Sequence, residues 1–211
     1  MTRTGRPRSY DEEKVVERAR NLFWSRGYHA TSVQDLVDNL GLQRASLYGA
    51  FGDKHRLYLR ALSLYIRENR ERLAAALRED GPVLPVLRRM LTNPATLTGV
   101  SGRDQPRGCL VGNTTAELVP GDDAAQAMVA AAYDGFVEVV SDALRRGQAN
   151  GEVVTTATPE AQALLLQIVF QGAALVARAG IDRKRLDESI DALIDLLRQP
   201  AVPPPDWRPY R

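Results

Sequence analysis

The sequence predicts an all-α protein in which a small head of three helices precedes a larger helical body, with about nine helices altogether. Apolar residues recur every three or four positions through most of the 211 residues, which is typical of helices that bury one face. Gly and Pro residues interrupt this pattern where helices would end. Segment 31–54 fits two short helices joined by a tight turn.

The first helix of the head is expected over residues 10–26. Its first turn is acidic, which suits the positive end of a helix dipole, and Gly27 follows its last turn as a stop signal. The residues expected on its buried face are Val15, Ala19, Leu22 and Phe23.

The second helix is expected to begin at Thr31, because Gln34 follows three residues later at the spacing of a capping box. Gly41 is expected to end this helix, since glycine adopts the left-handed conformation at the least cost. Leu42 can then fill the core at the turn. The residues expected to form the buried stripe are Val33, Leu36, Val37 and Leu40.

The third helix, residues 44–50, combines an apolar inner face with a small, polar outer face. Leu47 and Phe51 point inward, whereas the outer face carries Gln43, Arg44, Ala45, Ser46, Tyr48 and Gly49. Small outer residues allow a helix to enter the major groove of DNA, where arginine can donate to guanine. The Tyr48 hydroxyl and the Lys54 ammonium are placed to contact phosphates. This pattern predicts a helix-turn-helix reader of DNA.

Residues from about 8 to 59 resemble the N-terminal domain of the TetR family of bacterial transcriptional regulators. The similar runs are Arg26-Gly27-Tyr28, residues 31–36, Leu40-Gly41-Leu42, Ser46-Leu47-Tyr48 and residues 51–54. The resemblance places Thr31, Tyr48 and Lys54 at phosphates and Gln34, Arg44, Ala45 and Gly49 at bases. The expected DNA-binding set is Thr31, Ser32, Gln34, Gln43, Arg44, Ala45, Ser46, Tyr48, Gly49 and Lys54. Gln43 stands where the family commonly has a capping Ser, so a ragged helix start is expected.

The body is expected to begin with a long helix over residues 53–78, capped by Asp53. Further helices are expected over 83–91, 110–118, 122–150, 159–179 and 186–197, with a loop over 92–106. The last residues, 199–211, contain five prolines and are expected to form an extended tail. The expected domains are therefore the DNA-binding head at 1–52, the ligand-binding and dimerisation body at 53–198, and the tail at 199–211.

The last two helices of the body carry more apolar surface than a single chain readily covers. Segment 161–179 is apolar on nearly every side, and 186–197 has a heptad-like stripe. Both helices either complete the core of one chain or form the contact between two. The resemblance favours a homodimer, because family members dimerise through their last two long helices. The expected dimerisation residues are Leu165, Ile168, Val169, Leu186, Ile190, Leu193, Ile194 and Leu197.

A segment of the body around Cys109 is a candidate sensing site. The order Gly108-Cys109-Leu110, then Asn113 and Glu117, resembles a subset of the family that includes regulators responding to reactive electrophiles. A helix N-terminus favours a reactive thiolate, but cysteine is also commonly a buried packing residue, so both interpretations stay open. Asn113 and Glu117 either line a pocket or pack helices together. The candidate cavity residues are Met90, Met128, Tyr133, Phe136 and Phe170, and all of them also suit a plain core.

Charge and composition agree with a DNA-binding head. Residues 1–56 carry 10 Lys and Arg against 7 Asp and Glu, whereas the remainder carries 18 against 19. Arg3, Arg6 and Arg8 precede the first helix as a basic arm, which either reaches the minor groove or forms a disordered tail. No signal peptide is expected, and the Gln residues of segment 161–179 argue against a membrane span, so we expect a cytoplasmic protein without a membrane partner.

The sequence contains no motif that predicts an enzyme. His29 and His55 lie in the head without metal-ligand spacing, and no phosphate loop or nucleophile elbow is present. We therefore expect a non-enzyme without cofactor or metal. The function predicted is a ligand-responsive regulator, most simply a repressor, that binds a palindromic operator as a homodimer and releases it on binding a small molecule. The alternative is a helical ligand-binding or interaction protein without specific DNA recognition.

Overall fold

A computed structural model describes residues 11–78, 81–93 and 107–200 of the chain. Within these ranges it contains nine α-helices and one short 3-10 helix, which confirms the predicted all-α fold. The expectations for the basic arm at Arg3, Arg6 and Arg8, for most of the 92–106 loop and for most of the 199–211 tail lie outside the described residues.

The head consists of α1 (Glu12–Arg26), α2 (Val33–Leu40) and α3 (Arg44–Phe51). Asp11 caps α1 by accepting from the backbone amides of Glu13 and Lys14. The prediction that Thr31 caps α2 was wrong by one residue. Ser32 is the cap, and it forms the capping box with Asp35, because the shorter Asp side chain closes the loop back to the Ser32 amide at 2.8 Å.

The turn between α2 and α3 matches its sequence signals. Gly41 adopts φ 67° and donates to the Val37 carbonyl, as expected for a glycine that ends a helix. Gln43 occupies the cap position of α3 but makes no capping hydrogen bond through its side chain. The amides at the start of this recognition helix are therefore left without a side-chain acceptor from the cap position.

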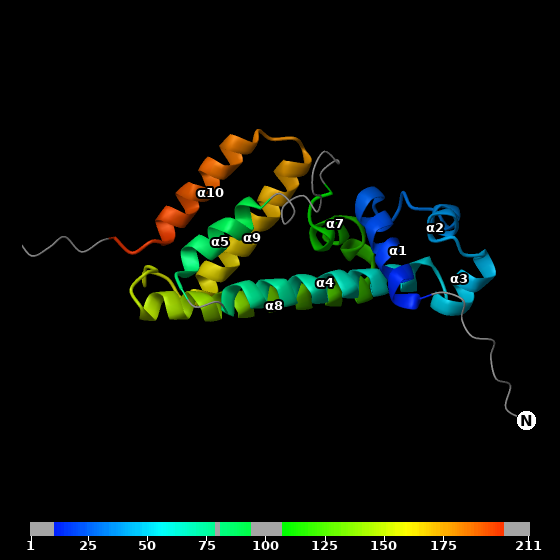
Figure 1. The fold of residues 1–211 in the computed structure, drawn as a ribbon, viewed down its shortest axis with the longest axis horizontal. Helices are drawn as coiled ribbons and strands as arrows, with labels where there is room; N and C mark the ends of the chain where they lie inside the picture. Colours follow the sequence, from blue (N-terminus) through cyan, green and yellow to red (C-terminus); the bar gives the residue numbers. More distant parts are fainter. Residues whose placement is uncertain (1–10, 79–80, 94–106, 201–211) are drawn as a thin grey trace, which may run out of the picture.

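The body contains α4 (Lys54–Arg78), α5 (Val83–Thr92), α7 (Leu110–Glu117), a 3-10 turn (Val119–Gly121), α8 (Asp123–Ala149), α9 (Pro159–Arg178) and α10 (Arg183–Leu197). The long helices α4 and α8 run side by side, as Figure 1 shows, with the head at one end of the molecule and α5, α9 and α10 towards the other. Helix α7 lies between the head and the body, so it is placed to connect them.

Two apolar clusters hold these parts together. The first joins the head to the start of α4, to α7 and to the start of α8, and its fully buried residues include Phe23, Leu36, Leu47 and Leu110. The second lies at the far end, among α4, α5, α8, α9 and α10. Since the first cluster crosses the boundary between head and body, the head does not pack independently of the body.

Helix α10 differs from its prediction in both start and role. It begins at Arg183 rather than at 186, because Asp182 caps it by accepting from the Arg185 amide at 3.1 Å. Its apolar stripe is buried within the chain's own core and packs near α5, so its assignment to a dimer surface was wrong for Leu186, Ile190, Leu193, Ile194 and Leu197. The amide of Gln199 donates to Glu152, so the chain is still held where the extended tail was expected to begin.

Helix α9 leaves one apolar face uncovered. Ile168 is 60% exposed, and the other large apolar side chains exposed on this helix are Leu164, Leu165, Leu175 and Val176. Val169, in contrast, is half-buried against the far core cluster. By length and composition alone, α9 (Pro159–Arg178) is apolar enough to cross a membrane, contrary to the sequence expectation, and 33% of that window is buried in the chain.

Candidate functional site

Helix α3 presents the polar face that the sequence predicted for a recognition helix. Leu47 and Phe51 are buried in the head core, whereas Gln43, Arg44, Ala45, Ser46, Tyr48 and Gly49 are exposed. Tyr48 is 41% exposed despite its large ring. The small residues between Arg44 and Tyr48 leave a narrow ridge, which is a shape that fits the major groove of DNA.

Thr31 and Lys54 are turned towards the inside of the head. Thr31 is fully buried, and its hydroxyl donates to the Gly27 carbonyl oxygen at 2.7 Å. The Lys54 ammonium donates to the carbonyl oxygens of Tyr28 and Thr31, both at 3.0 Å, and lies 4.1 Å from the centre of the Tyr28 ring. Burial lowers the pKa of Lys54. Thr31 is therefore not a free phosphate donor, contrary to the placement taken from the family pattern, whereas two of the three ammonium hydrogens of Lys54 are engaged and its contact with a phosphate stays a prediction.

Ser32 and Gln34, at the start of α2, also have partners within the helix. The Ser32 hydroxyl donates to Asp35 at 2.6 Å, and this hydrogen bond is the main cause of the lowered pKa of the Asp35 carboxyl. Gln34 donates to Asp38 at 2.8 Å on the exposed surface. Arg26 pairs with Asp35 across the head, so these charges fix α2 against the end of α1.

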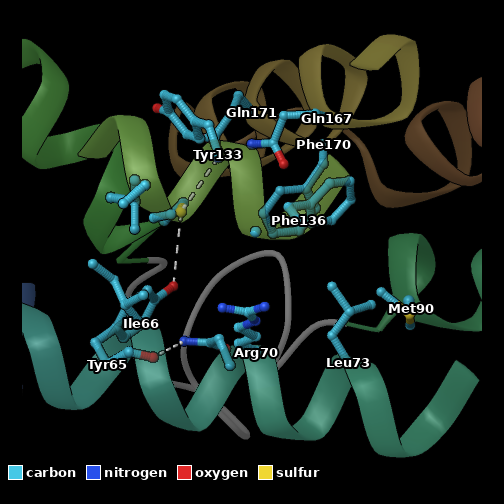
Figure 2. Close-up of a pocket in the computed structure, with 16 residues that line it drawn as sticks. Tyr65, Ile66, Arg70, Leu73, Met90, Tyr133, Phe136, Gln167, Phe170 and Gln171 are labelled. Atoms are coloured by element: carbon cyan, nitrogen blue, oxygen red, sulfur yellow. Dashed lines mark hydrogen bonds between the residues drawn. The ribbon is translucent and has the colours of Figure 1, made fainter. Parts of the chain in front are cut away.

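The body contains a cavity of about 140 Å³ between α4, α8 and α9. Figure 2 shows Tyr65, Arg70 and Leu73 on the α4 side, facing Phe136 and Phe170 across the cavity. Of the residues predicted to line a cavity, Met90, Tyr133, Phe136 and Phe170 do so. Met128 packs instead against the cluster that joins head and body.

Cys109 lines this cavity directly before the first turn of α7. Its side chain is buried, and the sulfur accepts from the Tyr65 hydroxyl at 3.8 Å and from the Gln171 amide at 3.6 Å. Burial beside Cys109 raises the pKa of the Tyr65 hydroxyl well above its ordinary value, so it remains a donor. Gly112 leaves room for Gln171, since a Cβ there would lie 2.5 Å from the Gln171 side-chain oxygen.

Asn113 and Glu117 do not line the cavity. Asn113 donates to the Arg107 carbonyl and accepts from Arg178, both at 3.0 Å, which ties the start of α7 to α9. The Glu117 carboxylate accepts from the backbone amides of Tyr28 at 2.7 Å and His29 at 3.2 Å. Of the two interpretations left open, the structure thus supports helix packing, and Glu117 packs against the head.

Three further contacts were not predicted from the sequence: the first joins the head to the body, and the other two join the start of α4 to α7 and to the cap of α8. The Trp24 indole donates to the Gly108 carbonyl at 2.9 Å, the Tyr58 hydroxyl pairs with Thr114 at 2.8 Å, and His55 contacts Asp122. Burial raises the pKa of Tyr58 to about 12. The sequence signal for these contacts is weak, because each pair is separated by more than 50 residues.

Two amides on α9, the buried Gln167 and the half-buried Gln171, are cavity residues that the sequence interpretation also missed. They stand four residues apart, hence on one helical face, in an otherwise apolar segment. In the sequence these Gln residues served only as an argument against a membrane span. Their spacing on one helical face also indicates the polar side of a cavity.

Comparisons with known proteins agree with this architecture along most of the chain. Residues 15–61 match the model of bacterial regulatory proteins of the TetR family, and residues 86–193 match the tetracyclin repressor-like C-terminal domain. The transcriptional repressor ComR of Escherichia coli K12 is 28% identical over 183 residues, covering 86% of both chains. The transcriptional repressor BdcR of the same organism is 37% identical over 107 residues, covering 51% of this chain and 53% of that protein.

Solved structures share the fold over nearly the whole chain. A cysteine mutant of the TetR family regulator CifR, complexed with 26-base-pair operator DNA, is 25% identical with a TM-score of 0.78 and covers 92% of this chain and 100% of its own. The reduced form of E. coli NemR has a TM-score of 0.80 at 20% identity, covering 90% and 98% respectively, which shows the fold alone. By both of its domains, the chain belongs to the TetR family of bacterial transcriptional regulators.

Proposed function

We propose that the protein is a ligand-responsive repressor that acts in the cytoplasm, binds a palindromic operator as a homodimer and releases it when a small molecule enters the body cavity. The observation that carries this proposal is the exposed polar face of α3 on a head that shares its core with the effector-binding body. Repression is supported by the names of the relatives, which include ComR and BdcR.

Arg44 and Tyr48 are the side chains of α3 best placed to contact DNA. Both are exposed, and no hydrogen bond or ion pair within the described residues occupies either of them. Arg44 would read guanine through its guanidinium, whereas Tyr48 would donate to a phosphate. Lys54 and Thr31 support this surface from inside, by holding the turn before α2 in place.

The homodimer would form through the exposed face of α9. Leu165 and Ile168 lie on this face, together with the exposed residues Leu164, Leu175 and Val176. Leu196 of α10, which is 77% exposed, adds to the apolar surface near it. A second copy would cover side chains that water disfavours, and a two-fold axis would present two copies of α3 to two half-sites.

Helix α7 would transmit the presence of an effector. Cys109 precedes its first turn and lines the cavity, while Glu117 is its last residue and holds two amides of the head. A ligand that shifts α7 would therefore move the head and change the spacing of the two α3 helices. An electrophile that enters the cavity would meet the Cys109 sulfur, which is how a sensing role for this residue would operate. A coupling of about 1–3 kcal/mol changes operator affinity roughly 5- to 150-fold.

Gel-shift titration of the purified protein against its own upstream DNA, across a salt series, tests the proposal. Arg44→Ala should lose about 1–3 kcal/mol of binding free energy and relax the preference at one position of each half-site. The matched control is Arg67→Ala, which removes the same charge from an exposed position on α4 outside the head.

A discrete complex of two chains per operator, with steep salt dependence, is the expected result for the unmodified protein. Equal losses for Arg44→Ala and Arg67→Ala would remove α3 from base recognition. Failure to select any site from genomic DNA would refute the repressor itself.

A further inference from the structure

We propose that the body cavity binds an uncharged molecule about one ring in size, whose carbonyl or hydroxyl group hydrogen-bonds to the side-chain amide of Gln167. The proposal rests on the proposed function, because it names the chemistry of the effector that the cavity would take. Its argument has three steps, which concern the polar groups, the size and the charge of the cavity.

Gln167 stands apart from the other polar groups of the cavity. It is only 6% exposed, it lines the cavity, and its amide has no hydrogen-bond partner among the described residues. Each of the other polar lining side chains makes at least one hydrogen bond: Asn69 donates to Tyr65, Arg70 to Glu138, Tyr133 pairs with Thr115, and both Tyr65 and Gln171 donate to Cys109.

The Gln167 amide atoms are not among the fully buried unpaired atoms of the described residues, so this unpartnered amide faces the open space of the cavity, where a ligand that displaces water must replace the hydrogen bonds of that water. Figure 2 shows Gln167 on the same side of the cavity as Phe136 and Phe170. An amide carries both a donor and an acceptor, so a ligand carbonyl or hydroxyl placed beside these rings would satisfy it.

The size and walls of the cavity suit a single flat ring. Its volume is about 140 Å³, and an apolar cavity of about 150 Å³ in another protein holds one benzene molecule. Phe136 and Phe170 are stacked with their ring centres 6.2 Å apart and their planes 18° apart, which gives one flat aromatic wall. Offset stacking on such a wall favours an unsaturated or aromatic ligand over a bulky aliphatic one.

The charges around the cavity favour a neutral ligand. Arg70 is the one charged side chain among the described residues that line it, and its guanidinium is paired with Glu138 at 2.7 Å. A ligand carboxylate would enter a largely apolar space where it must compete with Glu138 for the Arg70 guanidinium, and a buried charge without its own partner is strongly disfavoured.

Isothermal titration of the full-length protein with acetophenone, ethylbenzene and benzoate tests these steps. The first two probes have nearly the same shape and differ by one carbonyl group, whereas benzoate adds a charge. We expect acetophenone to bind more tightly than benzoate. In Gln167→Leu we expect acetophenone binding to weaken roughly 2- to 10-fold, the worth of one net hydrogen bond, and ethylbenzene binding not to weaken.

Gln162→Leu is the matched control, since it makes the same change on α9 at a buried amide that lies outside the cavity lining and already has partners. It should leave the ratio of the two affinities unchanged. Should Gln167→Leu fail to fold, as judged by circular dichroism, Gln167→Met replaces it because its shape is closer to that of Gln.

The proposal is overturned if the affinity ratio is the same with and without the Gln167 amide, if benzoate binds more tightly than acetophenone, or if none of the three probes binds. Gel shifts on the same preparations separate this failure from failure of the repressor. Operator binding without probe binding overturns only the ligand chemistry, whereas loss of operator binding by the unmodified protein overturns the proposed function.

Discussion

Lys54 and Thr31 show how the partners of a side chain define its role. The family pattern places both at phosphates, but Lys54 donates to two carbonyl oxygens of the turn between α1 and α2, and Thr31 donates to a third. These hydrogen bonds tie the turn to α4 and to its own first residue, and losing hydrogen bonds to carbonyls that are away from water destabilises a fold. We therefore interpret both residues as supports of the α2–α3 unit.

Gln43 allows the capping of the recognition helix α3 to be tested, because its side chain makes no hydrogen bond to the first turn of that helix. Gln43→Ser should stabilise the head by about 1 kcal/mol, since Ser accepts from the free amides of the first turn. Thermal unfolding followed by circular dichroism would measure the gain. Gln43→Ala, which provides no acceptor, is the control, and equal melting temperatures for Ser and Ala would contradict the capping argument.

Helices α9 and α10 both carry an apolar stripe, but the two stripes have opposite surroundings. The stripe of α10 is buried near α5, whereas α9 packs on α8 with one face and leaves Leu165 and Ile168 exposed with the other. The difference arises because α5 covers the apolar stripe of α10, whereas no helix of the described chain covers the outer face of α9. In a monomer the apolar face of α9 would stay in contact with water. This exposed face therefore favours association with a second copy of the chain.

Ile168→Lys should therefore weaken the homodimer, because it would place a charge at the centre of the exposed α9 face. Sedimentation velocity at micromolar concentration should show a shift from dimer to monomer, and operator affinity should fall with it. Ala127→Lys puts the same charge on an exposed position of α8 and should leave the dimer intact. A dimer that persists in Ile168→Lys would exclude this face as the contact.

At the scale of the whole molecule, α7 forms a short connection between the cavity and the head. Its two ends are fixed by Trp24 at Gly108 and by the amides of Tyr28 and His29 at Glu117. Gly27 adopts φ 88°, and a Cβ there would lie 2.6 Å from the Glu117 carboxylate, so the contact also requires glycine. The head, α7 and the part of the cavity wall that Cys109 forms are therefore joined by direct contacts.

Glu117→Gln tests that connection. The charge-assisted hydrogen bonds to two amides would be replaced by weaker ones, and we expect the free energy of unfolding to fall by about 1–3 kcal/mol. Hydrogen exchange should quicken at the amides of Tyr28 and His29. Glu138→Gln, which breaks an exposed ion pair with Arg70 instead, should change stability by about 1 kcal/mol or less and leave those amides protected. Unchanged protection in Glu117→Gln would show that the head is held by other contacts.

The sequence by itself determined the fold class and most helix positions. The cap at Asp53, the stop at Gly41 and the polar face of α3 are local features, and local hydrogen-bonding and helical spacing dictate them. The family pattern added the DNA-binding regulator, since its motifs lie at fixed spacing within one short segment, and with it the expectation of a dimer.

Only the tertiary structure decided which side chains meet across long separations. Glu117 reaches Tyr28 over 89 positions, and the two amides of α9 reach the cavity opposite α4. Periodicity assigns a residue to one face of a helix, but it does not say whether a neighbouring helix covers that face. For that reason the sequence placed the stripe of α10 at a dimer surface although α5 covers it, and it gave no sign that Thr31 is buried or that Gln167 faces the cavity without a partner among the described residues.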